Sequence, residues 1–199
     1  MKNLLSEDDQ DALRETCNLA MGAGGEALFD FTGQFVTLSI PKIQQLGGQS
    51  EPRDLLAEMG SVNAISVAAQ EFSLGQASAS ALCVACSESL AVLENAPGVS
   101  SSAVGARFHQ QMSQVLICTA LRRFAEVLEL ELALAPLQLL HHNQPWGKVD
   151  LPKIALLGDT LSVEMNYRLE SHVYNASLVF CLPEPMQTSV LAALHRLMA

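Results

Sequence analysis

The order of the predicted secondary-structure elements runs twice through the 199 residues of the chain. In each pass a long helix leads into a strand that ends near a proline, and two further strands and a shorter helix follow. Pro41 and Pro136 are 95 residues apart, and the same interval separates Cys86 from Cys181. Two landmarks in one register indicate an internal duplication, in which neither copy can bury its sheet face alone.

This duplication predicts a single domain over residues 1–199, made of two pseudo-symmetric halves at about 1–98 and 99–199. We expect an α+β fold in which helix, strand, strand, strand and helix follow one another twice. The halves should join across a pseudo-twofold axis into one mixed β-sheet, with the two long helices packed side by side. Apolar residues make up 49% of the chain, which is enough to supply a substantial core.

Hydrophobic periodicity and turn residues give approximate bounds for these elements. Ser6, with Asp9 three residues later, resembles a capping box that starts the first helix, and Gly33 is expected to end it. Residues 44–60 and the segment that contains His141 and His142 are expected to be loops. Further helices are predicted over 87–95, 103–128 and 183–198, and strands over 34–40, 62–72, 77–86, 129–135, 160–169 and 176–182.

The net charge of −10 argues against a nucleic-acid-binding protein, because contact with phosphate backbones requires clustered Lys and Arg. No apolar run reaches the roughly 18 residues of a membrane-spanning helix. The first residues turn acidic at once and do not resemble a signal peptide. We therefore expect a cytoplasmic protein with no membrane span.

Five cysteines in apolar surroundings suit a reducing compartment better than a disulfide framework. Cys83 and Cys86 form a CxxC pair, but they lie in an apolar strand that would direct them to opposite faces. A redox or zinc protein would require both sulfurs on one side of the backbone. No second pair and no His ligand follows at suitable spacing, so we expect structural cysteines and no metal site.

Three polar residues near the start of the first helix share one face. Asp11, Glu15 and Asn18 are spaced i, i+4 and i+7, which places them within an arc of roughly 60°. Gly22 and Gly25 continue the same line and would leave the surface beyond Asn18 open to a partner. The opposite stripe is expected to face the core and consists of Leu13, Cys17, Ala20, Gly24, Ala27 and Phe31.

The spacing Asp11-x3-Glu15-x2-Asn18-x22-Pro41 resembles the signature of the CheC/CheX/FliY family, (Asp/Ser)-x3-Glu-x2-Asn-x22-Pro. The resemblance covers nearly the whole chain and is most specific over residues 11–41. It implies the duplicated fold described above. It also implies a phosphatase that acts on the phospho-aspartate of a CheY-like response regulator, in chemotaxis or two-component signalling.

The chemistry of such a reaction gives each of these residues an expected role. A phosphorylated receiver already holds Mg²⁺ and a lysine, so the enzyme needs no cofactor of its own but must hold a water in line with the P–O bond. The Asn18 amide can accept a hydrogen bond from that water and donate one to a phosphoryl oxygen. By resemblance, Glu15 should contact the receiver lysine. Asp11 is expected to help docking, and Pro41 to be structural.

The second half departs from the motif. In a register of 95 residues, Asp11 corresponds to Ala106, Glu15 to Gln110 and Asn18 to Ser113. A serine hydroxyl is shorter than an asparagine amide, and a glutamine carries no charge to pair with a lysine. We therefore expect Gln110 and Ser113 to mark a degenerate second site, and one active site on the first helix.

An alternative function belongs to a different class. The same fold could serve as a non-catalytic adaptor for a receiver or for another chemotaxis protein. A phosphatase needs Glu15 and Asn18 on an open, protruding helix face, whereas an adaptor does not. The resemblance also leaves open a CheD-like regulator as a further partner.

Overall fold

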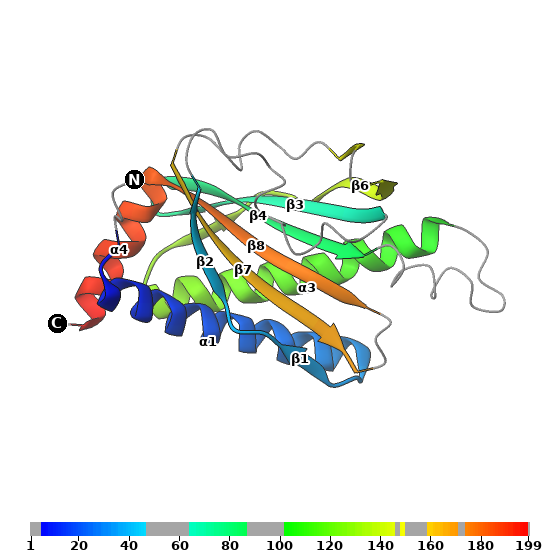
Figure 1. Cartoon of the computed structure of the whole chain (residues 1–199), viewed down its shortest axis with the longest axis horizontal. Coiled ribbons are helices and arrows are strands. Elements are labelled where there is room, and N and C mark those ends of the chain that lie inside the picture. The colour runs from blue at the N-terminus through cyan, green and yellow to red at the C-terminus, as the bar shows by residue number, and fades with distance from the viewer. Residues whose placement is uncertain are drawn as a thin grey trace.

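A computed structural model of the chain describes residues 5–46, 64–86, 102–145, 148–149, 159–170 and 174–198. The predicted helix at 87–95 and most of the predicted loop at 44–60 lie outside these ranges. Three helices and eight strands are described (Figure 1). In chain order they are α1 (Glu7–Thr32), β1 (Val36–Leu38), β2 (Lys42–Leu46), β3 (Ala64–Leu74), β4 (Ala77–Cys86), α3 (Ser102–Leu128), β5 (Leu132–Leu134), β6 (Gln138–Pro145), β7 (Thr160–Leu169), β8 (Asn175–Pro183) and α4 (Glu184–Met198).

The strand order of the sheet shows the pseudo-twofold arrangement directly. The path is β1-β7-β8-β4-β3-β5, with β2 paired to β7 and β6 paired to β3. Exchanging the strands of one half for their counterparts in the other reverses this order and leaves it otherwise unchanged. β4 and β8 form the central pair, so the two halves share one continuous sheet.

The sheet differs from prediction in one respect. Every pairing between described strands is antiparallel, whereas we expected a mixed sheet. Within the first half, the two-residue turn at Gly75 and Gln76 joins β3 to β4, and a connection this short can only join antiparallel strands. Across the pseudo-twofold axis, β4 and β8 run in opposite directions.

Two more strands lie where loops were predicted. β2 occupies Lys42–Leu46, and β6 occupies Gln138–Pro145, which includes His141 and His142. Pro41 separates β1 from β2, and Pro136 lies between β5 and β6. A proline has no N–H to donate to a ladder, so it interrupts each edge strand, and pairing resumes after it.

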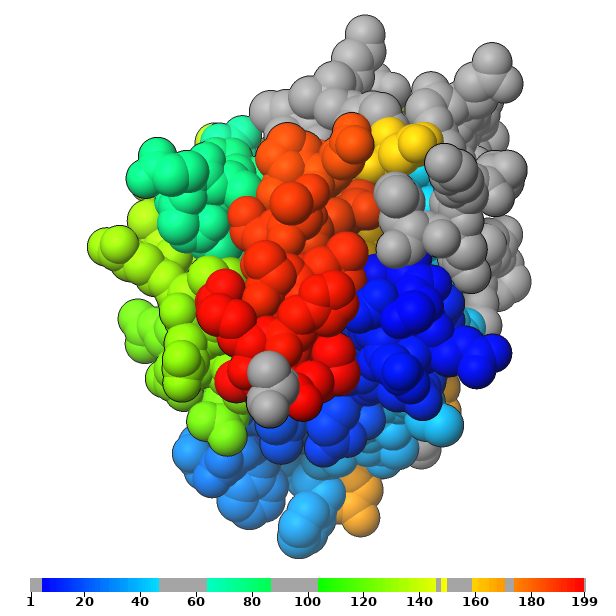
Figure 2. All heavy atoms as spheres, turned by 90° about the vertical axis from the view of Figure 1, so that its left-hand side faces the viewer, coloured from blue at the N-terminus to red at the C-terminus, as the bar shows by residue number. Residues whose placement is uncertain are grey.

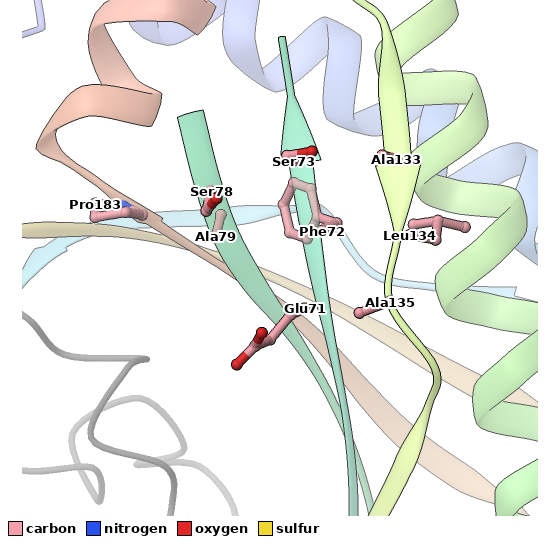
Figure 3. Close-up of a pocket in the computed structure, with 9 residues that line it drawn as sticks. All are labelled: Glu71, Phe72, Ser73, Ser78, Ala79, Ala133, Leu134, Ala135 and Pro183. Atoms are coloured by element: carbon pink, nitrogen blue, oxygen red, sulfur yellow. The ribbon is translucent and has the colours of Figure 1, made fainter. Parts of the chain in front are cut away.

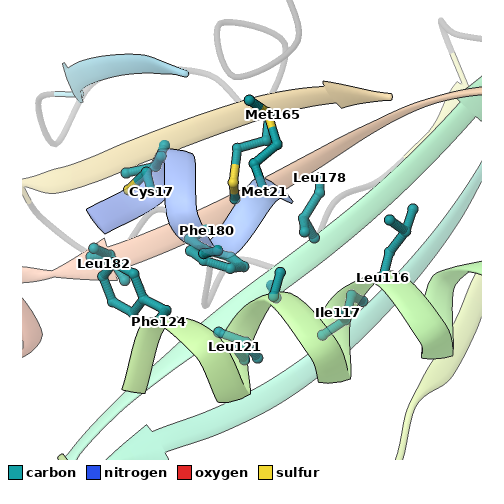
Figure 4. Packing of buried hydrophobic residues seen from close by; sticks show 14 of the residues in the cluster. Cys17, Met21, Leu116, Ile117, Leu121, Phe124, Met165, Leu178, Phe180 and Leu182 are labelled. Atoms are coloured by element: carbon teal, nitrogen blue, oxygen red, sulfur yellow. The ribbon is translucent and has the colours of Figure 1, made fainter. Parts of the chain in front are cut away.

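α1 and α3 lie side by side across one face of the sheet, as predicted (Figure 1). Their inward faces and the facing strand residues form the main hydrophobic core. Figure 4 shows Cys17 and Met21 of α1 near Phe180 of β8, with Leu121 and Phe124 of α3 on the other side. None of the described helices is long and apolar enough to cross a membrane.

The two cysteines of the CxxC pair lie on opposite sides of β4, as expected. Cys83 is buried in the core between the sheet and the helices, and Cys86 is half-buried and faces away from that core. Burial raises the pKa of the Cys83 thiol to about 11, which disfavours the thiolate that redox or metal chemistry requires. All five cysteines are free thiols.

The register between the halves is 96 residues along the helices, not 95. When 96 is added, every buried residue of α1 falls on a buried residue of α3; Leu13 falls on His109 and Cys17 on Ser113. The bounds of β1, 36–38, likewise become those of β5, 132–134. The cysteines and prolines that gave the shorter register lie near strand ends and at the break between edge strands, where one residue can be gained or lost without moving a helix.

α4 closes one end of the molecule. Figure 2 shows it beside the N-terminal part of α1, and the ring Nε2 of His195 lies 2.6 Å from Oδ1 of Asp9. Asp9 also accepts hydrogen bonds from the backbone N–H and the hydroxyl of Ser6, which forms the predicted capping box. Gly33 ends α1 with a left-handed backbone (φ +68°), also as predicted.

Candidate functional site

The polar face of α1 is open to solvent. Asp11, Glu15 and Asn18 are all exposed. Within the described part of the chain, neither Glu15 nor Asn18 makes a side-chain hydrogen bond, so both polar groups are available to a partner. A helix that is capped at both ends and packed along its opposite face presents these two side chains on a fixed backbone.

The face beneath them is packed much as the periodicity predicts. Leu13, Cys17, Ala20 and Gly24 are buried, and Ala27 is partly covered. Phe31 is different, because it is 48% exposed although it belongs to the stripe that we expected to face the core. It lies in the last turn of α1.

The glycines of α1 have two different roles. A Cβ on Gly24 would lie 2.8 Å from the Tyr167 hydroxyl, and one on Gly25 would lie 3.2 Å from a Leu38 methyl. Both glycines therefore let the helix approach the sheet. Gly22 is exposed, and a Cβ there would meet nothing within 4 Å. The open surface that we predicted for Gly22 and Gly25 is thus present at Gly22 only, since Gly25 is buried.

Asp11 and Pro41 complete the first-half motif. Asp11 accepts a hydrogen bond from the Arg14 guanidinium at 2.7 Å, at the exposed surface. A partner that uses Asp11 must compete with this ion pair, which at an exposed site contributes little. Pro41 is buried between β1 and β2, where it fixes the path of the sheet edge beside α1.

Charge distinguishes the two long helices. α1 carries seven acidic residues and one arginine, whereas α3 carries three arginines and one glutamate. The exposed face of α1 is therefore strongly negative. This favours approach by a positively charged surface and would repel a second copy of the same face.

The second-half residues that occupy the positions of Glu15 and Asn18 are Gln111 and Gln114, not Gln110 and Ser113. Both follow from the 96-residue register, and both are exposed. Ser113 is fully buried and takes the place of Cys17. Gln114 donates a hydrogen bond to the sulfur of Cys118. The second face therefore has an amide at each position and no carboxylate.

The remaining histidines do not form a metal centre in the described part of the chain, where no group of three or more His, Cys, Asp and Glu side chains could hold an ion. His109 is buried with its Nδ1 3.2 Å from the Tyr174 hydroxyl. His142 lies 3.1 Å from the hydroxyl of Ser66. The His195 ring is hydrogen-bonded to the Asp9 carboxylate.

Two grooves related by the pseudo-symmetry lie away from α1. One is lined by β3, β4, β5 and Pro183, and Figure 3 shows Glu71 and Phe72 of β3 beside the short strand that contains Ala133. Its counterpart is lined by β1, β7, β8 and Cys86. Neither groove is lined by any residue of α1, so neither includes Glu15 or Asn18.

A group of apolar side chains beyond Gly22 was not anticipated as a functional feature. Phe29, Phe35 and Leu38 are exposed and line a shallow groove at the C-terminal half of α1. One signal in the sequence pointed to them. Phe29 and Phe31 are two residues apart, so they face different sides of a helix and cannot both enter one core.

Comparison with known proteins supports the fold through structure alone. No family model and no curated protein matches the sequence. The structure of Thermotoga maritima FliY matches with a TM-score of 0.71 at 13% identity, covering 97% of this chain and 98% of that one. FliM in its complex with FliG from H. pylori gives a TM-score of 0.61 at 11% identity, covering 94% and 100%. The chemotaxis protein CheX from Desulfovibrio desulfuricans gives 0.53 at 9% identity, covering 85% and 99%.

Proposed function

We propose that this chain, which has the CheC-like fold shared by FliY, the FliM middle domain and CheX, is a phosphatase for the aspartyl phosphate of a CheY-like receiver. The observation that carries the proposal is the state of Glu15 and Asn18. Both lie on one exposed face of α1, neither is engaged with another described residue, and the surface beyond them is open at Gly22.

A convex helix face suits a substrate that is itself a folded protein. The phosphoryl group sits in the receiver's own pocket, with its Mg²⁺ and lysine, so the phosphatase supplies only what that pocket lacks. The Asn18 amide accepts a hydrogen bond from the attacking water with its oxygen. Its NH₂ group donates to a phosphoryl oxygen, which places the water in line with the P–O bond.

Glu15 lies one turn before Asn18 and contacts the receiver lysine in this proposal. A carboxylate facing the phosphoryl group itself would be repelled by it, so a role as general base is disfavoured. The acidic face of α1 adds long-range attraction for a partner surface that carries Lys or Arg. Contact with the lysine fixes the register of the helix against the phosphate.

The proposal places a single active site on the first half. Gln111 on α3 has no charge with which to hold a lysine, and the Gln114 amide donates a hydrogen bond to the Cys118 sulfur. Gln114 is also one methylene longer than an asparagine, so its amide would reach a different point above the helix.

The decay of a phosphorylated CheY-like receiver, measured with and without the protein, tests the proposal. Wild type should accelerate phosphate loss, and Asn18→Ala should reduce the acceleration on the order of 100-fold, the usual cost of removing one transition-state contact. Gln114→Ala is the matched control, because it removes the amide at the equivalent position of the second half, and it should retain nearly full activity. Equal losses in the two variants would contradict the single-site assignment.

A second candidate function is a non-catalytic adaptor with the same fold. The likeness to FliM, whose H. pylori structure was solved together with FliG, favours it. An adaptor would bind the phosphorylated receiver and leave the lifetime of the phosphate unchanged. The same decay measurement, combined with a binding titration, therefore separates the two functions.

A further inference from the structure

The apolar groove on the first half has a defined structure. After α1 ends at Gly33 the chain reverses, and the ring of Phe35 returns over that of Phe29 with the centroids 5.4 Å apart. The Phe35 carbonyl accepts a hydrogen bond of 2.9 Å from the backbone N–H of Glu170, which fixes the turn. With Leu38 from β1, these rings line a groove of roughly 260 Å³.

The side chains that line this groove are exposed to solvent although they are large and apolar. Phe35 is 70% exposed, Phe29 is 41% exposed and Leu38 is 37% exposed. Single exposed apolar residues need no explanation, but a contiguous set around one groove marks an interaction surface.

The second half of the molecule shows that the fold does not require them. Adding 96 to Phe29 and Phe35 gives Ala125 and Glu131. The equivalent groove on the second half is lined by Ala125 and three leucines beside Arg122, Glu126 and Glu129, and by no aromatic residue. The same backbone therefore carries an aromatic groove on the first half only, and that groove is on the same helix as Glu15 and Asn18.

The groove is continuous with the candidate active face. Asn18, Gly22 and Phe29 follow one another along one side of α1, and Gly22 forms the near edge of the groove. At 1.5 Å per residue, Phe29 lies about 17 Å along the helix axis from Asn18. A folded domain that covers Asn18 can reach that far without changing shape.

We propose that this groove is a second contact for the receiver, and that it takes up an exposed apolar side chain of the receiver flanked by Lys or Arg. The proposal rests on the proposed function, since it concerns the partner of that site. Glu26 lines the groove and Asp30 lies one turn further on, both exposed, so the groove has an acidic rim. A basic surround on the partner would complement it.

Charge also argues against a second copy of this chain as the occupant. Two copies that met through the groove would bring two α1 helices together, each with seven acidic residues and one arginine. That arrangement is repulsive, whereas a receiver with a basic rim is attracted by the same charges.

The test uses a CheY-like receiver domain phosphorylated with acetyl phosphate, and variants of the full chain. Phe35→Ser should raise the half-saturating receiver concentration on the order of tenfold and leave the rate at saturation within about twofold, because it removes a docking contact and not a reacting group. Phe35→Leu, which keeps an apolar side chain, should restore most of the affinity. Leu197→Ser is the matched control: Leu197 is 48% exposed on α4, away from the groove, and its loss should change neither parameter.

The outcomes separate this inference from the proposed function. If wild type accelerates phosphate loss and Phe35→Ser leaves the half-saturating concentration unchanged, the groove is not a receiver contact, although the phosphatase stands. If wild type binds the receiver without accelerating decay, and Phe35→Ser weakens that binding, the groove contact stands and the phosphatase fails. A wild-type dimer that Phe35→Ser converts to a monomer with unchanged receiver affinity would assign the groove to self-association and overturn the inference.

Discussion

At the scale of single residues, two nearby glycines of α1 have opposite surroundings, one buried and one open. Gly24 is buried against the Tyr167 hydroxyl, and Gly22 faces open solvent. Both occur in a helix interior, where glycine costs about 1 kcal/mol relative to alanine. The cost at Gly24 is offset by close packing of helix on sheet. Nothing in the fold offsets it at Gly22, which suggests that the space there is kept for a partner.

Alanine substitutions at these two positions should therefore have opposite effects on stability. Gly22→Ala should stabilise the protein by about 0.5–1 kcal/mol, because the helix gains a better helix former and nothing is displaced. Gly24→Ala should destabilise it by about 1–3 kcal/mol, because its Cβ would overlap the Tyr167 hydroxyl. Urea unfolding of both variants beside wild type measures the difference. Destabilisation by Gly22→Ala would show that the site is more crowded than the structure indicates.

Gly22→Ala also bears on function. If a receiver lies flat on this face, the added methyl should weaken its binding while the protein itself becomes more stable. Loss of binding together with gain of stability is a pattern that a purely structural glycine does not produce.

At the scale of elements, the start of α1 is joined to the end of the chain. Asp9 forms the capping box with Ser6, and its carboxylate is hydrogen-bonded to the His195 ring on α4. The pKa of Asp9 is held below its usual value of 3.8, chiefly by the hydrogen bond from the Ser6 hydroxyl. The hydrogen bond from the Ser6 backbone N–H and the hydrogen bond and charge of His195 lower it further. The ionised carboxylate is thus favoured in the folded state.

The lowered pKa of Asp9 determines whether stability rises or falls with pH. Because the folded-state pKa is below that of the unfolded chain, Asp9 stabilises the fold above about pH 4, and its contribution is lost as the pH falls through the folded-state value. Asp9→Asn should therefore lower the stability of the protein at pH 7 by about 1 kcal/mol, a typical cost for a lost cap. The difference between the variant and wild type should shrink below about pH 4. Thermal melts at pH 7 and pH 3 measure it, and a constant difference would contradict the assignment.

At the scale of the whole molecule, the sequence predicted the architecture well and the register poorly. The two long helices, their burial against one sheet and the pseudo-twofold pairing all follow from apolar periodicity repeated in two halves. The extra edge strands β2 and β6 were not predicted, because the burial of their residues does not alternate regularly and so leaves little periodicity to detect.

The register was wrong by one residue because it depended on landmarks outside the helices. On a helix, one residue is a rotation of about 100°, so the error replaced the true counterpart of Asn18 by a core residue. Ser113 is buried, although Gln110 is exposed, whereas Gln111 and Gln114 are both exposed. The first-half site was less sensitive, since Glu15 and Asn18 belong to one helix and their spacing alone sets their common face. The spacing of Phe29 and Phe31 indicated that one of these rings must be exposed, but the groove itself was not predicted, because it depends on how the chain turns back after Gly33.

The corrected register also identifies an asymmetry in the core that contributes to the pH dependence of stability. His109 of α3 takes the place of Leu13 of α1. It is fully buried beside Tyr174, the residue before β8, and near Cys83 of β4. Burial, with a smaller contribution from the charge of His142, lowers the pKa of His109 to about 4. The folded state therefore holds a neutral imidazole in a position where the other half has a leucine.

The sign of the effect follows from this lowered pKa. Between about pH 6.5 and 4 the unfolded chain binds a proton at His109 and the folded chain does not, so stability falls as the pH falls through this window, by about 3 kcal/mol in total. His109→Leu, which copies the residue of the first half, should remove that part of the pH dependence. The variant also loses the bond to Tyr174, so its stability at pH 7 is expected to be lower by about 1 kcal/mol. Urea unfolding of both proteins at several values between pH 7 and 4 gives the two slopes. If the slopes are equal, His109 is not the group that titrates, and the decline with acid must come from the carboxylates.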